Sequence, residues 1–139
     1  IEYMDVGNRN GWAMDQVLPA AVMIERIHRH WPLEPLGRSP GATALRWRYR
    51  DGAAAIGVIA SISEPFCGDC NRLRITADGQ AFTCLFAARG TDLKPSLTTD
   101  TDLEHAICAL WQQRVDHYSE EGRTAARTAS HAEMAYLGG

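Results

Sequence analysis

Three cysteines with the spacing of a metal site are the first feature of this chain that could do chemistry. In "FCGDCNRLRITADGQAFTCLF", Cys67 and Cys70 form a Cys-X2-Cys pair, and Cys84 follows after thirteen intervening residues. A Cys-X2-Cys loop can direct two thiolates at one ion. The chain between Cys70 and Cys84 has the pattern of a hairpin, which would return Cys84 to the start of that hairpin. We therefore predict that the three sulfurs share one metal site.

The spacing leaves the kind of metal open. A thioredoxin-like redox pair is disfavoured, because such a pair starts a helix and this one leads into a strand pattern. A structural zinc site needs a fourth ligand, which only the last predicted helix region could supply, from His105, Cys108 or His117. A 4Fe-4S cluster on three cysteines instead leaves one iron open for a substrate. Zinc and cluster therefore both stand as alternatives at this point.

Two arginines that closely follow the cysteines in sequence suggest a site for a phosphorylated molecule. Arg72 and Arg74 follow Cys70 by two and four residues, so they share one face if this segment is a strand. Paired guanidinium groups make bidentate contacts to phosphorylated molecules. The alternative is a solvated strand face, which we expect for the alternating arginines of "ALRWRYRDG" at 44–52. Arg72 and Arg74 are thus candidate phosphate ligands.

Composition restricts the class of protein. The chain has 139 residues, of which 45% are hydrophobic and 22% charged, as in a globular domain with one core. The net charge of -3 disfavours general nucleic-acid binding, which usually needs a basic surplus. No apolar run approaches the roughly 20 residues of a membrane span. We expect a cytoplasmic protein with no membrane and no nucleic-acid partner.

Hydrophobic periodicity predicts the elements that would position these residues. "IEYM" at 1–4 has the pattern of a buried strand, and an apolar stripe after Pro19 predicts a helix over 20–31 that ends before Pro32. Residues 32–43 are expected to be a turn-rich connection. Period-two alternation over 44–50, the Asp51-Gly52 turn and an apolar return over 53–62 predict a hairpin.

The second half of the chain repeats this arrangement and adds a helix. A turn at Asp78-Gly79 predicts another hairpin, ending near Cys84. Thr101 and Glu104 have capping-box spacing and predict the start of the last helix. An apolar stripe follows and places Cys108 at its edge, where we expect it to pack as a small hydrophobe; its members are Leu103, Ile107, Leu110, Trp111 and Tyr118. The expected fold class is α+β with one small antiparallel sheet.

The beginning of the chain suggests a piece of a longer protein. The first residue is Ile1 rather than Met, and it opens directly into the predicted strand. A lone strand of this kind usually has neighbours upstream, so we expect a C-terminal fragment. An exposed strand edge also invites pairing with another chain, which makes a homodimer one expected assembly.

At this point the motifs resemble a known family. "FCGDCNRLRITADGQAFTCLF", "IEYMD" at the start and "YLGG" at the end are similar to the C-terminal region of the MoaA-type GTP 3′,8-cyclases, radical S-adenosylmethionine enzymes of molybdenum cofactor biosynthesis. The resemblance covers nearly all of the chain and depends on three separate motifs. It implies residues 1–35 as the last strand and helix of an incomplete α/β, TIM-like barrel. Residues 36–139 would form the domain that carries a second 4Fe-4S cluster.

The resemblance also implies a role for each candidate residue. Cys67, Cys70 and Cys84 would hold the second 4Fe-4S cluster, whose open iron contacts GTP. Arg72, Leu73 and Arg74 would line the GTP site. Met4 would touch S-adenosylmethionine, and Gly138 and Gly139 would form a tail that reaches the active site.

The family's remaining machinery would come from elsewhere. Its first cluster, which cleaves S-adenosylmethionine, is held by a Cys-X3-Cys-X2-Cys motif in an N-terminal barrel, and that motif does not occur in these 139 residues. The missing barrel is therefore an expected partner, and the isolated chain is expected to be catalytically inert. The alternatives are a zinc-binding structural module and the auxiliary-cluster domain of another radical S-adenosylmethionine enzyme.

Overall fold

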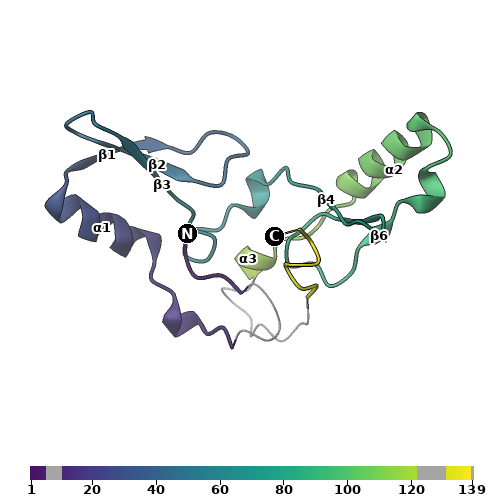
Figure 1. The fold of residues 1–139 in the computed structure, drawn as a ribbon, viewed down its shortest axis with the longest axis horizontal. Coiled ribbons are helices and arrows are strands. Elements are labelled where there is room, and N and C mark those ends of the chain that lie inside the picture. The colour runs from purple at the N-terminus through teal and green to yellow at the C-terminus, as the bar shows by residue number, and fades with distance from the viewer. Residues whose placement is uncertain (6–10, 122–130, 139) are drawn as a thin grey trace. The chain divides into compact units, whose positions relative to one another are not determined.

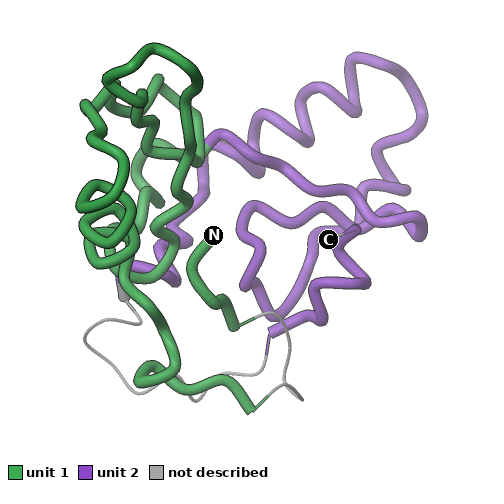
Figure 2. Tube along the Cα trace, turned by 60° about the vertical axis from the view of Figure 1, so that its left-hand side comes forward, with its two compact units in different colours: residues 1–5, 11–70 green, residues 6–10, 71–139 purple. Residues whose placement is uncertain are grey.

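The computed structural model describes residues 1–5, 11–121 and 131–138, and within them the chain forms two compact units (Figures 1 and 2). Unit 1 holds residues 1–5 and 11–70, and the described part of unit 2 runs over 71–121 and 131–138. The elements of unit 1 are η1 Met14–Gln16, α1 Ala20–His30, β1 Leu33–Gly37, β2 Leu45–Tyr49, β3 Ala55–Val58 and η2 Cys67–Asp69. Those of unit 2 are β4 Arg74–Ile75, β5 Gln80–Phe82, β6 Thr91–Asp92, η3 Lys94–Ser96, α2 Asp100–Gln112 and α3 Tyr118–Glu121.

Unit 1 is a helix packed on a three-stranded antiparallel sheet (Figure 1). The strand order is β1-β2-β3, and Trp47 of β2 lies opposite Ile56 of β3. The predicted alternation of β2 is confirmed, because Leu45, Trp47 and Tyr49 pack against the core while the arginines between them are exposed. The buried core of unit 1 is made of Ala20, Ile24, Leu33, Val58 and Ala60. The predicted helix after Pro19 is thus confirmed as α1, which ends at His30.

Two local predictions for unit 1 were wrong. The expected connection over 32–43 contains strand β1, which tolerates Pro35 because it is an edge strand of the sheet. Residues 1–5, expected to begin as a strand, have no strand assignment. The Glu2 N–H donates to the Ile59 carbonyl at 3.1 Å, and the Tyr3 carbonyl accepts from the Trp12 indole N–H at 2.9 Å. One backbone–backbone bond and one bond to a side chain do not make a ladder.

Unit 2 contains a second three-stranded antiparallel sheet, of order β4-β5-β6, so the single sheet expected from the sequence is in fact two. The predicted hairpin is confirmed, with Arg74 opposite Phe82. Gly79 has φ +82° in its turn, where a side chain would be strained. At Gly90 a Cβ atom would stand 2.6 Å from the Phe82 ring, so only glycine allows β6 to start that close to β5.

The start of α2 lies two residues earlier than the sequence predicted. Thr99 is the N-cap, and its hydroxyl accepts a 3.1 Å hydrogen bond from the Asp102 N–H. The predicted capping box of Thr101 and Glu104 is wrong, because both residues lie inside the helix. Thr99-X-X-Asp102 has the same spacing, and the carboxylate of Asp102 accepts from the hydroxyls of Thr98 and Thr99.

Replacing Thr99 by alanine is expected to destabilise unit 2 by about 1 kcal/mol, because an amide of the first helical turn loses its acceptor. The free energy of unfolding in urea measures the change. Thr101→Ala is the matched control, since Thr101 is exposed within the helix, and should stay within about 0.5 kcal/mol of the wild type. A larger destabilisation by Thr101→Ala than by Thr99→Ala would contradict the N-cap assignment.

The packing expected for Cys108 was wrong. Its side chain is exposed on α2, and α2 contains no fully buried residue. The apolar stripe of this helix, from Leu103 to Trp111, is half-buried, and Tyr118 lies beyond it on α3. Among the described residues no helix is long and apolar enough to pass through a bilayer.

The coarse fold class is confirmed. Helices and antiparallel sheets occur in separate runs of the chain, which is compatible with α+β. The barrel context, and with it the division into 1–35 and 36–139, stays a prediction.

Candidate functional site

The Cys67–Cys70 pair lies on a single tight turn of unit 1. Phe66 precedes the 3-10 turn η2, and the Cys70 N–H closes it by donating to the Cys67 carbonyl at 3.2 Å. Residues three apart in a 3-10 turn lie one above the other. The turn therefore brings the two half-buried cysteines close together along the backbone, as two ligands of one group must be.

Contacts from a neighbouring loop hold this turn in place. The Asp69 carboxylate accepts a 2.9 Å hydrogen bond from the Gly41 N–H. The Arg38 guanidinium lies 5.2 Å from the centre of the Phe66 ring, within cation-π range. Both contacts come from the loop between β1 and β2, so that loop fixes the residues before and inside the cysteine turn.

A buried carboxylate anchors the segment that leads into the turn. Glu2 is 2% exposed, and its Oε2 accepts from the N–H groups of Ile62 and Ser63 at 2.7 and 2.9 Å. Its Oε1 accepts from the Ser63 hydroxyl and, at 2.7 Å, from the N–H of Ala20 at the start of α1. Burial by itself raises the pKa of Glu2, but the hydrogen bonds from Ser63, Ile62 and Ala20 outweigh it and lower the pKa. Glu2 is thus an ionised side chain that accepts hydrogen bonds from the backbone at the start of α1 and at residues 62–63.

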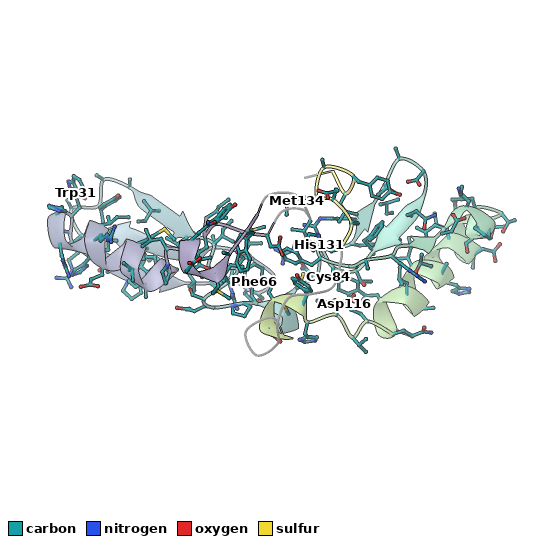
Figure 3. All side chains as sticks on the ribbon, turned by 90° about the horizontal axis from the view of Figure 1, so that it is seen from below. Trp31, Phe66, Cys84, Asp116, His131 and Met134 are labelled. Carbon is teal, nitrogen blue, oxygen red and sulfur yellow. The ribbon has the colours of Figure 1, made fainter. Side chains whose placement is uncertain are left out.

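Cys84 lies in unit 2, in the loop that follows β5. Its Sγ accepts a 3.4 Å hydrogen bond from the Phe86 N–H, and its carbonyl accepts from the Ala87 N–H at 3.3 Å. The next ring, Phe86, is stacked on Tyr118 with centroids 4.7 Å apart, and His131 meets Phe86 edge-on at 5.7 Å. Figure 3 shows Cys84 and His131 in the same part of unit 2. The loop is therefore packed directly after Cys84, around the Phe86 ring.

The predicted ligand set is divided between the units. Cys67 and Cys70 belong to unit 1 and Cys84 to unit 2. All four cysteines of the chain are thiols. Within the described ranges no three His, Cys, Asp or Glu side chains are gathered as a metal would need. The shared site thus stays a prediction, and the structure supports its Cys67–Cys70 half locally.

The predicted GTP residues occupy the start of unit 2. Arg72, Leu73 and Arg74 are all half-buried. The expectation that Arg72 and Arg74 share one strand was wrong, because β4 begins at Arg74. Leucine between two half-buried arginines, three residues after Cys70, still makes this segment a candidate for binding an anion beside the cysteines.

The residues assigned to the two ends of the chain lie in different units. Met4 is half-buried in unit 1. Gly138 is exposed in unit 2 with φ +79°, and Gly139 lies outside the described residues. Before Gly138, the Tyr136 hydroxyl donates to the Asp78 carboxylate, with distances of 3.0 and 2.9 Å to its two oxygens. The hydroxyls of Thr76 and Tyr136 lower the pKa of Asp78.

Three structurally important residues escaped the sequence analysis. Glu2 stands within the segment 1–4, which was predicted to be a buried strand, and no role was predicted for its side chain. Asp78 was recognised only as a turn residue, and Tyr136 only as part of the tail. Only Glu2 could have been found from the sequence. A carboxylate within an apolar run needs hydrogen-bond partners if it is buried.

Comparison with known proteins supplies the wider context. Residues 1–120 match the family model described as Molybdenum Cofactor Synthesis C. The chain is 73% identical over all 139 residues to the GTP 3′,8-cyclase of Synechococcus sp. (strain CC9605) and 66% identical to that of strain WH7803. Over 128 residues, or 86% of the chain, it is 55% identical to the GTP 3′,8-cyclase of Acidothermus cellulolyticus.

The match covers only part of each relative. The chain spans 40% of the length of the two Synechococcus enzymes and 35% of the Acidothermus one. The family model nevertheless accounts for most of the chain, from the Glu2 segment through both cysteine loops to α3. The chain therefore belongs to the Molybdenum Cofactor Synthesis C family.

Proposed function

We propose that this chain is the C-terminal part of a GTP 3′,8-cyclase, which converts GTP to (8S)-3′,8-cyclo-7,8-dihydroguanosine 5′-triphosphate on the way to cyclic pyranopterin monophosphate. The observation that carries this proposal is the similarity to a protein of that name, which is 73% identical over all 139 residues of the chain. The family assignment to molybdenum cofactor synthesis supports the same pathway. By themselves these 139 residues are inert in this proposal, because they contain no Cys-X3-Cys-X2-Cys motif for a radical-generating cluster.

In this proposal Cys67, Cys70 and Cys84 hold the second 4Fe-4S cluster. The donor set fits, because thiolates are the usual ligands of iron–sulfur clusters and no fourth protein ligand is required when one iron faces a substrate. The geometry of η2 supports the first two ligands, since both thiols sit on one closed turn. When bound, the cluster would supply an open iron that could act as a Lewis acid toward the guanine base.

The chain's other residues bind and position the reactants. Arg72 and Arg74 would pair with the triphosphate through charge-assisted hydrogen bonds, and Leu73 would pack on the nucleotide. Met4 would contact S-adenosylmethionine bound in the N-terminal barrel. The Gly138–Gly139 tail would enter the active site, where residues without side chains leave room for a ligand. Holding GTP and S-adenosylmethionine close together in a fixed orientation would lower the barrier to their reaction.

A graft onto a relative tests the proposal. The matching 40% of the Synechococcus sp. (strain CC9605) cyclase would be replaced by this chain. After anaerobic reconstitution, we expect the graft to consume GTP and form the cyclised triphosphate, and the isolated chain to form none. Product formation is measured by liquid chromatography and mass spectrometry.

Two single substitutions in the graft serve as matched controls. Cys67→Ser should abolish product formation because it removes a proposed cluster ligand. Cys108→Ser should leave it unchanged, because Cys108 is exposed on α2. A soluble graft that leaves GTP intact, while the unaltered relative converts it, would contradict the proposed function.

A further inference from the structure

The last described segment of the chain is fastened to unit 2 at two points. We call residues 131–138 the C-terminal strap. At its beginning the Ala132 N–H donates to the Ala87 carbonyl at 3.1 Å, next to the loop of Cys84. Near its end Tyr136 bonds to Asp78 in the turn between β4 and β5. The strap therefore spans the hairpin from the Cys84 end to the turn.

Packing accompanies both points of attachment. His131 is 6% exposed and meets the rings of Phe86 and Tyr118 edge-on. The Tyr136 ring meets Phe82 of β5 edge-on at 6.1 Å, and Leu137 beside it is 5% exposed. The Tyr136 side chain itself is 47% exposed. Its hydroxyl can therefore be removed without opening a cavity.

The acceptor of the Tyr136 hydroxyl is itself held in position. The Thr76 hydroxyl donates to the same Asp78 carboxylate at 2.5 Å, and the Thr76 backbone closes the turn through the Gln80 carbonyl at 2.9 Å. The strap is compact over its last residues, with the Leu137 N–H donating to the Met134 carbonyl at 3.0 Å. A fixed acceptor and a compact donor segment make this hydrogen bond a defined fastening for the Tyr136 end of the strap.

We propose that the Tyr136–Asp78 hydrogen bond is a latch that closes the C-terminal strap over the Cys84 loop and thereby limits access to the Cys84 thiol. Opening the latch would remove the hydrogen bond between the strap and the turn, so that the Tyr136 end would be held only by the packing of the Tyr136 ring and Leu137. The latch would also determine where Gly138 emerges from unit 2. Asp78 and Tyr136 are in this sense positioning residues. The inference goes beyond the proposed function and holds whether or not Cys84 binds a cluster.

Alkylation of the metal-free, reduced chain tests the latch. Iodoacetamide labelling would be followed by trypsin digestion, which separates residues 75–89, with Cys84 alone, from 90–114, with Cys108 alone. Loss of one partly exposed hydrogen bond to a carboxylate should raise the Cys84 labelling rate about fivefold in Tyr136→Phe. The labelling rate of Cys108, exposed on α2, should not change. An unchanged Cys84 rate would overturn the proposal.

Three further measurements separate the latch from general loosening. Tyr3→Phe removes the hydroxyl of a comparably exposed tyrosine in unit 1 and should leave Cys84 labelling unchanged. Asp78→Asn combined with Tyr136→Phe should add little to the single change, as expected for two partners of one bond. Amide hydrogen exchange in Tyr136→Phe should accelerate in 131–138 and not in α2. Acceleration that extends to α2 would mean that unit 2 as a whole is destabilised, and would overturn the latch.

Discussion

Replacing Cys84 by serine is expected to abolish assembly of a four-iron cluster on this chain. After anaerobic reconstitution with iron and sulfide, the wild-type chain should be brown and hold about four irons. Cys84→Ser should hold less than about one iron, because a three-cysteine cluster cannot tolerate the loss of one thiolate. The oxygen of serine can still accept from the Phe86 N–H, so the loop itself should keep its fold. Absorption spectra and iron counts measure the outcome.

The matched control is Cys108→Ser, which should retain the full iron content because Cys108 is exposed on α2. Addition of GTP should change the spectrum of the wild-type cluster if its open iron binds the guanine. A colourless chain that takes up one zinc ion, in the wild type as well as in Cys108→Ser, would contradict the cluster assignment and favour a structural zinc module.

Replacing Glu2 by glutamine is expected to destabilise unit 1 by about 3 kcal/mol, since hydrogen bonds to a buried carboxylate are lost and two donors then face the new amide group. The carboxylate accepts from Ile62 and Ser63 in one segment and from Ala20 in another, so two separate segments lose their common acceptor. Loss of these hydrogen bonds should also loosen residues 62–66, which lead into the Cys67–Cys70 turn. Urea unfolding at neutral pH measures the change.

The pH dependence of stability provides a second test of Glu2. Its pKa is lower in the folded chain than the value of about 4.3 for an unfolded glutamate. The stabilisation is therefore complete above the unfolded pKa, and is lost as the pH falls through the folded pKa. Glu2→Gln should remove this acid dependence. The exposed neighbour Glu64 is the control, and Glu64→Gln should change stability by no more than about 0.5 kcal/mol. Equal effects at both positions would contradict the anchoring role.

Periodic local patterns were the part of the fold that the sequence could predict. Alternation identified β2, and the apolar stripe between two prolines identified α1, because one buried face determines both patterns. Strand β1 was missed because Pro35 and Gly37 resemble a connection, and only pairing with β2 makes them a strand. The N-cap of α2 was misplaced because Thr99 and Thr101 both begin a plausible capping pattern.

The candidate site, too, could be predicted from the sequence only in part. The Cys67–Cys70 pair could be predicted because its ligands are close in sequence and one turn places them together. The Glu2 anchor and the Tyr136–Asp78 latch could not, because their partners are about 60 residues away and no local pattern encodes such contacts. The strand pattern of residues 1–4 predicted no partner for Glu2, whereas burial with several donors determined its actual place.

A bound metal group would also act on the unfolded chain. A group held by Cys67, Cys70 and Cys84, as proposed above, would close a loop of thirteen residues between Cys70 and Cys84. A covalent cross-link over a loop of similar size restricts the unfolded chain by about 3 kcal/mol. Loss of the metal would remove this restriction and lower the free energy of unfolding by a similar amount.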